Sequence, residues 1–119
     1  MSKQALSGIR VLDFSQVLAG PFATQLLAQL GAQVIKIEQP VGGDMTRGLM
    51  SANSDGMAPS FLAANLGKRS LTLDLKNPKA TEIVHKLVAK ADVIVENFKP
   101  GTIEPVSYTH LRAHETIAD

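Results

Sequence analysis

The stretch that decides the fold is residues 9–40, IRVLDFSQVLAGPFATQLLAQLGAQVIKIEQP. Its apolar start predicts a strand that ends at Asp13, and residues 34–38 predict a second strand. Pro21 at the first helical position and Gly31 just past the last one are start and stop signals for a helix between them. Its apolar side chains recur at helical spacing, and we expect them to share one side of that helix: Phe22, Ala23, Leu26, Leu27 and Leu30.

Two strands joined by a helix form a βαβ unit, and its right-handed crossover makes the strands parallel. Ligands of such sheets bind beyond the carboxyl ends of the strands, where the amino terminus of a helix offers unpaired N–H groups. The loop at residues 15–20 follows the first strand and is therefore the first candidate site.

The rest of the chain predicts two more helices and two more strands. We expect a short helix at residues 59–65, a strand at 70–75, and a strand at 93–95. A longer helix begins at Pro78, is capped by Asn77 and runs through Lys90. Its predicted core-facing residues are Ala80, Ile83, Val84, Leu87 and Val88. This order of elements predicts an α/β fold with four strands in a parallel sheet and flanking helices.

Composition narrows the class of protein. The chain has 119 residues, which suits one domain or a piece of one, and 45% of them are hydrophobic, enough for a packed core. A net charge of +1 argues against nucleic acid or an anionic membrane as the main partner. The absence of cysteine excludes disulfides and thiolate sites and favours the cytoplasm. Neither a signal peptide nor an apolar run of about 20 residues is evident.

The last stretch reads differently from the rest. Residues 106–116, VSYTHLRAHET, match the translation of a transposase-adapter oligonucleotide. We therefore expect residues 1–105 to be native and residues 106–119 to be a translated sequencing-adapter scar. His110 and His114 lie four apart, as in a metal-binding helix, but in this interpretation the spacing is accidental and no metal site is expected. The gene product is expected to continue beyond Glu104, which makes the chain an amino-terminal fragment.

Polar and basic residues follow each predicted strand, so they should meet at one edge of the sheet. Lys76 and Lys99 suit phosphate groups, and further candidates lie in flanking loops: Arg47, Lys68 and Arg69. Asn97 can both donate to and accept from an amide or a base edge, and Phe98 can stack on a ring. Such an edge would suit a nucleotide-like or pantetheine-like ligand.

Other charged residues have ordinary structural interpretations. Asp13 is expected to be a loop or helix-cap hydrogen bonder rather than a catalytic acid. Asp74 and Glu38 are expected to be solvated strand ends, and His85 an exposed imidazole in the middle of its helix.

Several motifs, in order, resemble the amino-terminal part of class III coenzyme A transferases, the CaiB/BaiF family: VLDFSQVLAGPFATQLLAQLGAQVIKIEQP, GGDMTR, NLGKRSLTLDLK and ADVIVENFKPGTIE. The resemblance covers residues 6–104. The family includes formyl-CoA transferases, carnitine-CoA transferases and α-methylacyl-CoA racemases. The resemblance implies a Rossmann-like large domain, a smaller second domain, and two subunits interlocked like links of a chain.

The resemblance also implies that CoA lies along the edge described above. The thioester end would be lined by Val17, Leu18 and Ala19. The adenine and phosphate region would be held by Leu73, Asp74, Leu75 and Lys76, with Gln39 standing where many members have Arg. The pantetheine or diphosphate would contact Asn97, Phe98 and Lys99.

The implied reaction moves CoA from an acyl-CoA to a carboxylic acid through a nucleophilic aspartate. That aspartate lies downstream of the PGT-x-E motif in the family and has no match here, so the fragment is expected to be inactive. Expressed alone, it is also expected to be marginally stable or to aggregate, because its sheet edges and helix faces would lack the partner chain. CoA and acyl-CoA would be substrates, with no permanently bound cofactor. The alternatives are a racemase of the same family, an NAD-type dinucleotide domain, and a flavodoxin-like binding module. Glu38 has the spacing of a ribose-binding acid, but the G-x-G-x-x-G motif is missing.

Overall fold

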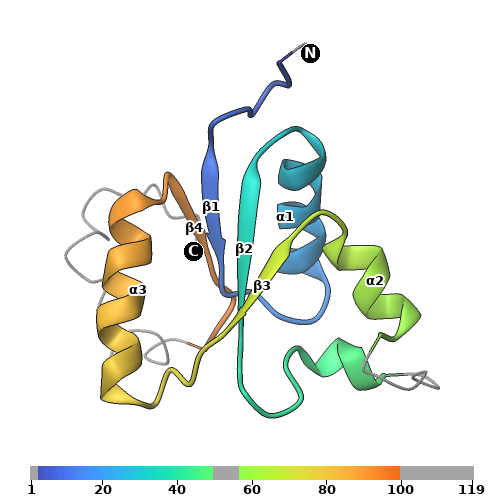
Figure 1. The fold of residues 1–119 in the computed structure, drawn as a ribbon. Coiled ribbons are helices and arrows are strands. Elements are labelled where there is room, and N and C mark those ends of the chain that lie inside the picture. Colours follow the sequence, from blue (N-terminus) through green and yellow to red (C-terminus); the bar gives the residue numbers. More distant parts are fainter. Residues whose placement is uncertain (1–2, 50–56, 100–119) are drawn as a thin grey trace.

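A computed structural model describes residues 3–49 and 57–99 of the chain. The elements, in order, are β1 (Arg10–Asp13), α1 (Ala19–Gln29), β2 (Gln33–Glu38), the 3₁₀ helix η1 (Met45–Gly48), α2 (Pro59–Asn65), β3 (Arg69–Thr72), α3 (Pro78–Lys90) and β4 (Val93–Val95). The strands form one parallel sheet in the order β3-β2-β1-β4 (Figure 1). The predicted α/β fold is confirmed. The adapter tail expected at residues 106–119 lies outside the described residues and stays a prediction.

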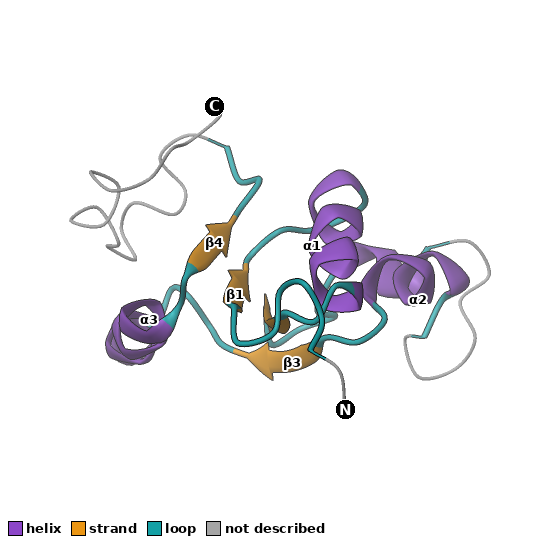
Figure 2. Ribbon diagram, turned by 90° about the horizontal axis from the view of Figure 1, so that it is seen from above, coloured by secondary structure: helices purple, strands orange, loops and turns teal. Residues whose placement is uncertain are grey.

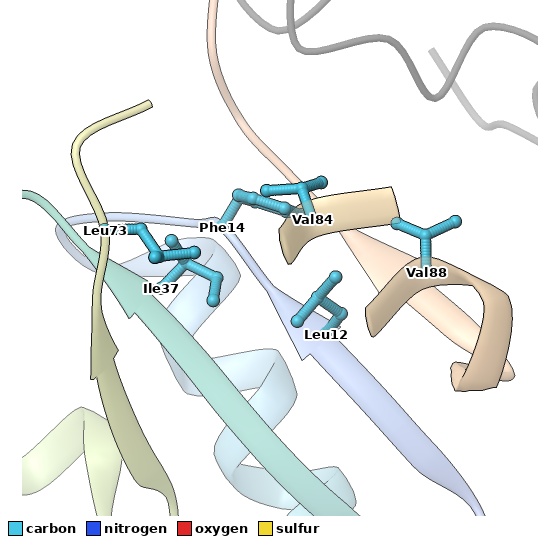
Figure 3. Close-up of a cluster of buried hydrophobic side chains, with 6 residues drawn as sticks. All are labelled: Leu12, Phe14, Ile37, Leu73, Val84 and Val88. Carbon is cyan, nitrogen blue, oxygen red and sulfur yellow. The ribbon is translucent and has the colours of Figure 1, made fainter. Parts of the chain in front are cut away.

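Helices cover both faces of the sheet. Helices α1 and α2 lie on one face and α3 lies on the other, as the view along the sheet shows (Figure 2). Because strand side chains alternate between faces, β1 sends Val11 and Asp13 toward α1 and Leu12 toward α3. The main hydrophobic core lies on the α3 face (Figure 3) and contains Leu12, Phe14, Ile37, Leu73, Val84 and Val88. A smaller cluster lies on the α1 face and contains Val11, Ala32 and Val34.

Most elements follow their predicted bounds. Helices α2 and α3 and strand β4 match them, and the Asn77 side chain caps α3 by accepting a hydrogen bond from the Lys79 N–H at 2.9 Å. Gly31 follows the last turn of α1 with a φ of +108°, a conformation that glycine adopts without a steric penalty. Strand β3 ends at Thr72 rather than residue 75, because the chain turns at Asp74, whose carbonyl accepts from the Asn77 N–H at 2.9 Å.

Helix α1 corrects two expectations. It begins at Ala19, so Pro21 is its third residue; this is tolerated because the first N–H groups of a helix have no partner within it. The residues expected to face the core mostly do not: Phe22, Leu26 and Leu30 are exposed, whereas Thr24 and Gln25 are buried. Thr24 is buried against the sheet, where its hydroxyl donates to Asp13 at 2.6 Å. Gln25 is buried against α2, where its side chain donates to the Ala63 carbonyl at 2.7 Å and accepts from the Leu66 N–H at 2.6 Å.

In α3 the predicted face holds for Ala80, Val84 and Val88, which are buried, while Ile83 is 42% exposed. The 3₁₀ helix η1 was not predicted. Its cap is the Asp44 carboxylate, which accepts from the Thr46 N–H at 2.9 Å.

Candidate functional site

A pocket of about 980 Å³ opens at the carboxyl edge of the sheet. This volume is at the upper end of the range for small-molecule sites, roughly 300–1,000 Å³. Residues from the ends of β2 and β3 and from the segment after β4 line the pocket. Among them are six of the residues expected to bind a ligand: Gln39, Leu73, Asp74, Leu75, Lys76 and Phe98. The structure thus brings together three segments that are distant in the sequence.

The remaining expected residues lie beside the pocket rather than in its wall. Val17, Leu18 and Ala19 are exposed and follow Gln16, which does line the pocket. Asn97 holds that segment: its side-chain oxygen accepts from the Gln16 N–H at 3.0 Å, and its side-chain nitrogen donates to the Gln16 carbonyl at 2.8 Å. Lys99 is exposed near the end of the described chain. In this structure Asn97 therefore holds the backbone of the loop at residues 15–20 by hydrogen bonds.

Two of the pocket-lining residues, Phe98 and Asp74, also make contacts within the protein. The half-buried Phe98 ring packs on Phe14, with ring centroids 6.5 Å apart and planes tilted by 56°. Asp74 is exposed, as expected for a solvated strand end, and its carboxylate accepts from the Lys76 N–H at 3.0 Å. This contact fixes the turn that carries Lys76, the one lysine among the described residues that line this pocket.

The loop at residues 15–20 is compact and leads into α1. A side chain at Gly20 would collide with Ser15, so the start of the helix can approach the loop this closely only with glycine there. Leu18 at the N-cap provides no side-chain hydrogen bond. Within residues 3–49 and 57–99, the N–H groups of Leu18, Ala19 and Gly20 have no hydrogen-bond partner. Such groups at a helix amino terminus attract negative charge.

A set of buried charges beneath this loop was missed in the sequence. Lys36 pairs with Asp44 at 2.8 Å, Lys68 with Asp13 at 3.0 Å, and Arg47 with Glu38 at 2.7 Å. We call these six residues the buried ion-pair network. Its visible signal was Lys36 between two isoleucines in a predicted strand.

The network corrects several expectations. Glu38 was expected to be a solvated strand end but is only 4% exposed, because Arg47, Ser70 and the Asp44 N–H all donate to it. Lys68 and Arg47, proposed as phosphate binders, have internal partners; Arg47 also stacks on the Phe61 ring, 3.8 Å from its centroid. Arg69 lies at the opposite edge of the sheet, where it lines a smaller hollow of about 330 Å³. Asp13 accepts from the Ser15 N–H in the following loop, as expected, but it is also fully buried and paired with Lys68.

Burial and hydrogen bonding together shift the pKa values of the residues in the network. Burial alone would raise the pKa of Glu38, but hydrogen bonds from Arg47, Ser70 and the Asp44 backbone outweigh it and lower the pKa from 4.5 to about 2. Burial likewise opposes ionisation of Asp44, yet hydrogen bonds from Lys36 and Thr46 keep its pKa below the ordinary value. Burial lowers the pKa of Lys68, although the Asp13 carboxylate opposes this. The hydrogen bond to Glu38 raises the pKa of Arg47.

The described part of the chain contains neither a metal-binding cluster nor a membrane-spanning helix. No cluster of three or more His, Cys, Asp or Glu side chains able to hold a metal ion occurs there. No helix of that part is long and apolar enough to cross a membrane.

Comparisons with known proteins place the chain in a family. The sequence profile of CoA-transferase family III matches residues 6–116. The formyl-CoA:oxalate CoA-transferase of Bradyrhizobium diazoefficiens is 48% identical over 105 residues, which are 88% of this chain but 25% of that enzyme. The enzyme of the same name from Rhodopseudomonas palustris is 46% identical over 112 residues, 94% of this chain and 26% of the relative. This chain thus spans about a quarter of the length of these curated relatives.

Solved structures agree with this assignment. A CaiB/BaiF family protein from Brucella suis superimposes with a TM-score of 0.84 and 41% identity, covering 94% of this chain and 31% of that one. A hypothetical protein from Mycobacterium tuberculosis gives a TM-score of 0.81 with 42% identity, over 94% of this chain and 31% of its own. Profile, sequence relatives and fold all identify the same group, and the chain belongs to CoA-transferase family III.

Proposed function

We propose that this chain is the CoA-binding, amino-terminal part of an acyl-CoA:carboxylate CoA-transferase. The observation that carries the proposal is the pocket at the carboxyl edge of the sheet, which is lined by six of the expected residues, from the ends of β2 and β3 and the segment after β4. Membership of CoA-transferase family III supports CoA thioesters as the substrate class.

The chemistry of the pocket suits the parts of CoA. Lys76 lines the pocket and Lys99 lies near it, and their ammonium groups can pair with the phosphates. Leu73, Leu75 and Phe98 provide an apolar wall against which an adenine ring or the pantetheine chain can pack. The thioester would lie at the exposed residues 17–19, next to the free N–H groups at the start of α1. These N–H groups would stabilise negative charge that develops on a thioester oxygen.

Catalysis is proposed to need the rest of the parent protein. In the proposed reaction a carboxylate nucleophile of the parent attacks the acyl carbon of the acyl-CoA and releases the CoA thiolate, which leaves a mixed anhydride on the enzyme. The thiolate then attacks the enzyme's own carbonyl carbon and displaces the donor acid, which leaves an enzyme–CoA thioester. The acceptor carboxylate attacks this thioester to form a second anhydride, and the released thiolate attacks the acceptor carbonyl, which gives the new acyl-CoA and regenerates the enzyme carboxylate. The nucleophile is expected downstream of residue 104, so we expect this chain to bind CoA without transferring it. Because the curated relatives are formyl-CoA:oxalate CoA-transferases, formyl-CoA and oxalate are the first donor and acceptor to test, ahead of racemase substrates. The interlocked dimer and the cytoplasmic location stay proposals for the parent.

Binding of CoA to the purified chain tests this proposal. Titration calorimetry should give saturable binding of CoA and at least about tenfold weaker binding of NAD. The variant Lys76→Ala should weaken CoA binding by about three- to tenfold, because it removes a charge-assisted contact to phosphate. Lys86→Ala is the matched control, since Lys86 is exposed on α3 and does not line the pocket. Tighter binding of NAD than of CoA would overturn the proposal and favour a dinucleotide domain.

A chimera tests the activity of the whole protein. Residues 6–104 of this chain would replace the matching quarter of the Bradyrhizobium enzyme, with which the chain shares 48% identity. We expect the chimera to form oxalyl-CoA from formyl-CoA and oxalate. A folded chimera that binds CoA but acts on neither compound would contradict this donor and acceptor while leaving the CoA site intact.

A further inference from the structure

Val17 adopts a backbone conformation that its side chain disfavours. Its φ is +74°, and it is the one non-glycine residue with a positive φ in the described chain. A positive φ is a genuine outlier for a β-branched residue and costs of order a factor of ten or more in population. Such strain persists only when surrounding contacts enforce it, and it is concentrated at functional sites.

The contacts that enforce this conformation come from two charged residues of the buried ion-pair network. Both carboxylate oxygens of Asp44 accept from the Val17 N–H, at 3.3 and 3.4 Å. The Lys36 ammonium group donates to the Ser15 carbonyl at 2.9 Å and pairs with Asp44 at 2.8 Å. Lys36, on β2, and Asp44, at the cap of η1, thus hold the backbone on both sides of Gln16, at Ser15 and Val17. We call these contacts the grip.

The grip has a consequence at the pocket. Gln16 lies between Ser15 and Val17 and lines the pocket, and two hydrogen bonds with the Asn97 side chain also hold its backbone. Immediately after Val17 come the N–H groups of Leu18, Ala19 and Gly20, which have no hydrogen-bond partner among the described residues. The side chains of Asp44 and Lys36 are 0% and 2% exposed, so neither can touch a ligand itself.

We propose that Lys36 and Asp44 are positioning residues for the CoA site: they hold Val17 in its left-handed conformation and so orient Gln16 and the start of α1 toward the ligand. This inference rests on the proposed function. It concerns two residues outside the pocket wall, for which the sequence alone predicted no role.

A double-mutant cycle between Asp44→Asn and Val17→Gly tests the proposal. Glycine adopts a positive φ freely, so a chain carrying Val17→Gly needs no grip to form this loop. Asp44→Asn should weaken CoA binding about tenfold in the Val17 chain but less than about threefold in the Val17→Gly chain. A residue that only supports overall stability would cause the same loss of affinity in both backgrounds. Equal losses, or none in either, would overturn the proposal.

Glu38→Gln is the matched control, since Glu38 is also buried and ion-paired on β2 but does not contact residues 15–17. Its hydrogen bond with Asp44 comes from the Asp44 backbone N–H, for which the side-chain oxygen of a glutamine can still accept. It should change CoA affinity by less than about twofold at a temperature where the variant is folded. A tenfold loss with Glu38→Gln would show that any damage to the network impairs binding, and would overturn the specific role of Lys36 and Asp44.

Two ligand-free measurements separate this inference from the proposed function. In the unmutated chain, the Val17 amide should exchange with solvent at least about tenfold more slowly than those of Ala19 and Gly20. In thermal melts, Asp44→Asn should lower Tm more in the Val17 chain than in the Val17→Gly chain. If these results hold while CoA does not bind, the proposed function fails and the grip on Val17 stands. Equal exchange rates would overturn the grip even where CoA binds.

Discussion

The two faces of the sheet are built from different interactions. On the α3 face, the carboxyl halves of the strands present Leu12, Phe14 and Ile37 to an apolar core closed by Val84 and Val88 (Figure 3). On the α1 face, the same parts of the strands present Asp13, Lys36 and Glu38, which are equally buried. One residue along a strand therefore separates an apolar environment from an ionic one.

This difference shows that apolar burial and buried ion pairs contribute differently to stability and to the positioning of loops. Apolar burial is strong and non-directional, so the α3 face supplies stability without fixing any particular loop. Buried ion pairs gain little net stability over apolar packing but are costly to break and strongly directional. The α1 face accordingly anchors the segments that surround the candidate site, through Asp13 at residue 15 and Asp44 at residue 17.

The largest effect is expected on the apolar face. Phe14→Ala should lower the free energy of unfolding by about 3–5 kcal/mol, because it leaves a cavity in the main core. Phe14 is 1% exposed, whereas Leu26, an apolar residue of α1, is 43% exposed. Leu26→Ala is therefore the control and should cost less than about 1 kcal/mol. Urea denaturation followed by circular dichroism measures both. Similar losses for the two variants would mean that the core is not on the α3 face.

A loss of about 3 kcal/mol is expected when the ionic face is broken at Lys68. Lys68→Met leaves the Asp13 carboxylate, which is 0% exposed, without its ammonium partner. Adding Asp13→Asn should restore part of the lost stability, since it removes the unpaired charge. Lys86→Met, on the exposed side of α3, controls for the loss of a lysine. If the double variant is less stable than Lys68→Met alone, charge is not what makes the single variant unstable.

The sequence predicted the apolar face better than the ionic one. Val84 and Val88 recur at helical spacing, a pattern that is typical of a helix face turned toward the core. The strands and α-helices of the described chain, and the edge at which the strands end, followed from the same patterns, whereas η1 did not. In contrast, Phe22 and Leu26 look like core residues in the sequence but are exposed, and a local pattern cannot show which side of a helix meets a polar part of the sheet.

The candidate site was predicted only in part, for a similar reason. Residues 73–76 and Phe98 could be placed at the pocket because the carboxyl ends of parallel strands share one edge. The partners of Lys36 and Glu38 could not be placed, because Asp44 and Arg47 lie at the cap of η1 and within it, in a connection whose path depends on those contacts. Charged residues in a sequence are most often solvated, and only tertiary structure reveals the exceptions.

Acid should weaken the ionic face selectively. The pKa of Glu38 is about 2 in the folded chain and 4.5 for an unperturbed glutamate, so between these values the unfolded chain binds more protons. The contribution of ionised Glu38 to the free energy of unfolding is therefore fully present above about pH 4.5 and is lost as the pH falls toward 2. We expect a loss of about 2 kcal/mol, less than the full shift implies because Arg47 is partly exposed to solvent. Urea denaturation between about pH 5 and pH 2 measures it.

The matched variant for this pH dependence is Glu38→Gln, which cannot ionise. Its stability at about pH 5 should be lower than that of the unmutated chain, but it should fall less steeply as the solution is acidified. The remaining slope belongs to other carboxylates whose pKa is lowered, Asp44 among them. Parallel pH profiles for the two chains would refute the assignment of this stability to Glu38.

The smallest effect is expected from a single exposed hydrogen bond, at the amino terminus of α3. Asn77→Ala removes the cap that accepts from the Lys79 N–H and should cost about 1 kcal/mol. Asn77→Asp keeps an acceptor at the positive end of the helix dipole and should cost almost nothing. Both losses can be read from urea denaturation at neutral pH. Asn77 has the same kind of directional contact as the buried network but is exposed to water. If Asn77→Ala were as damaging as Lys68→Met, burial would not be what makes the contacts of the ionic face costly to break.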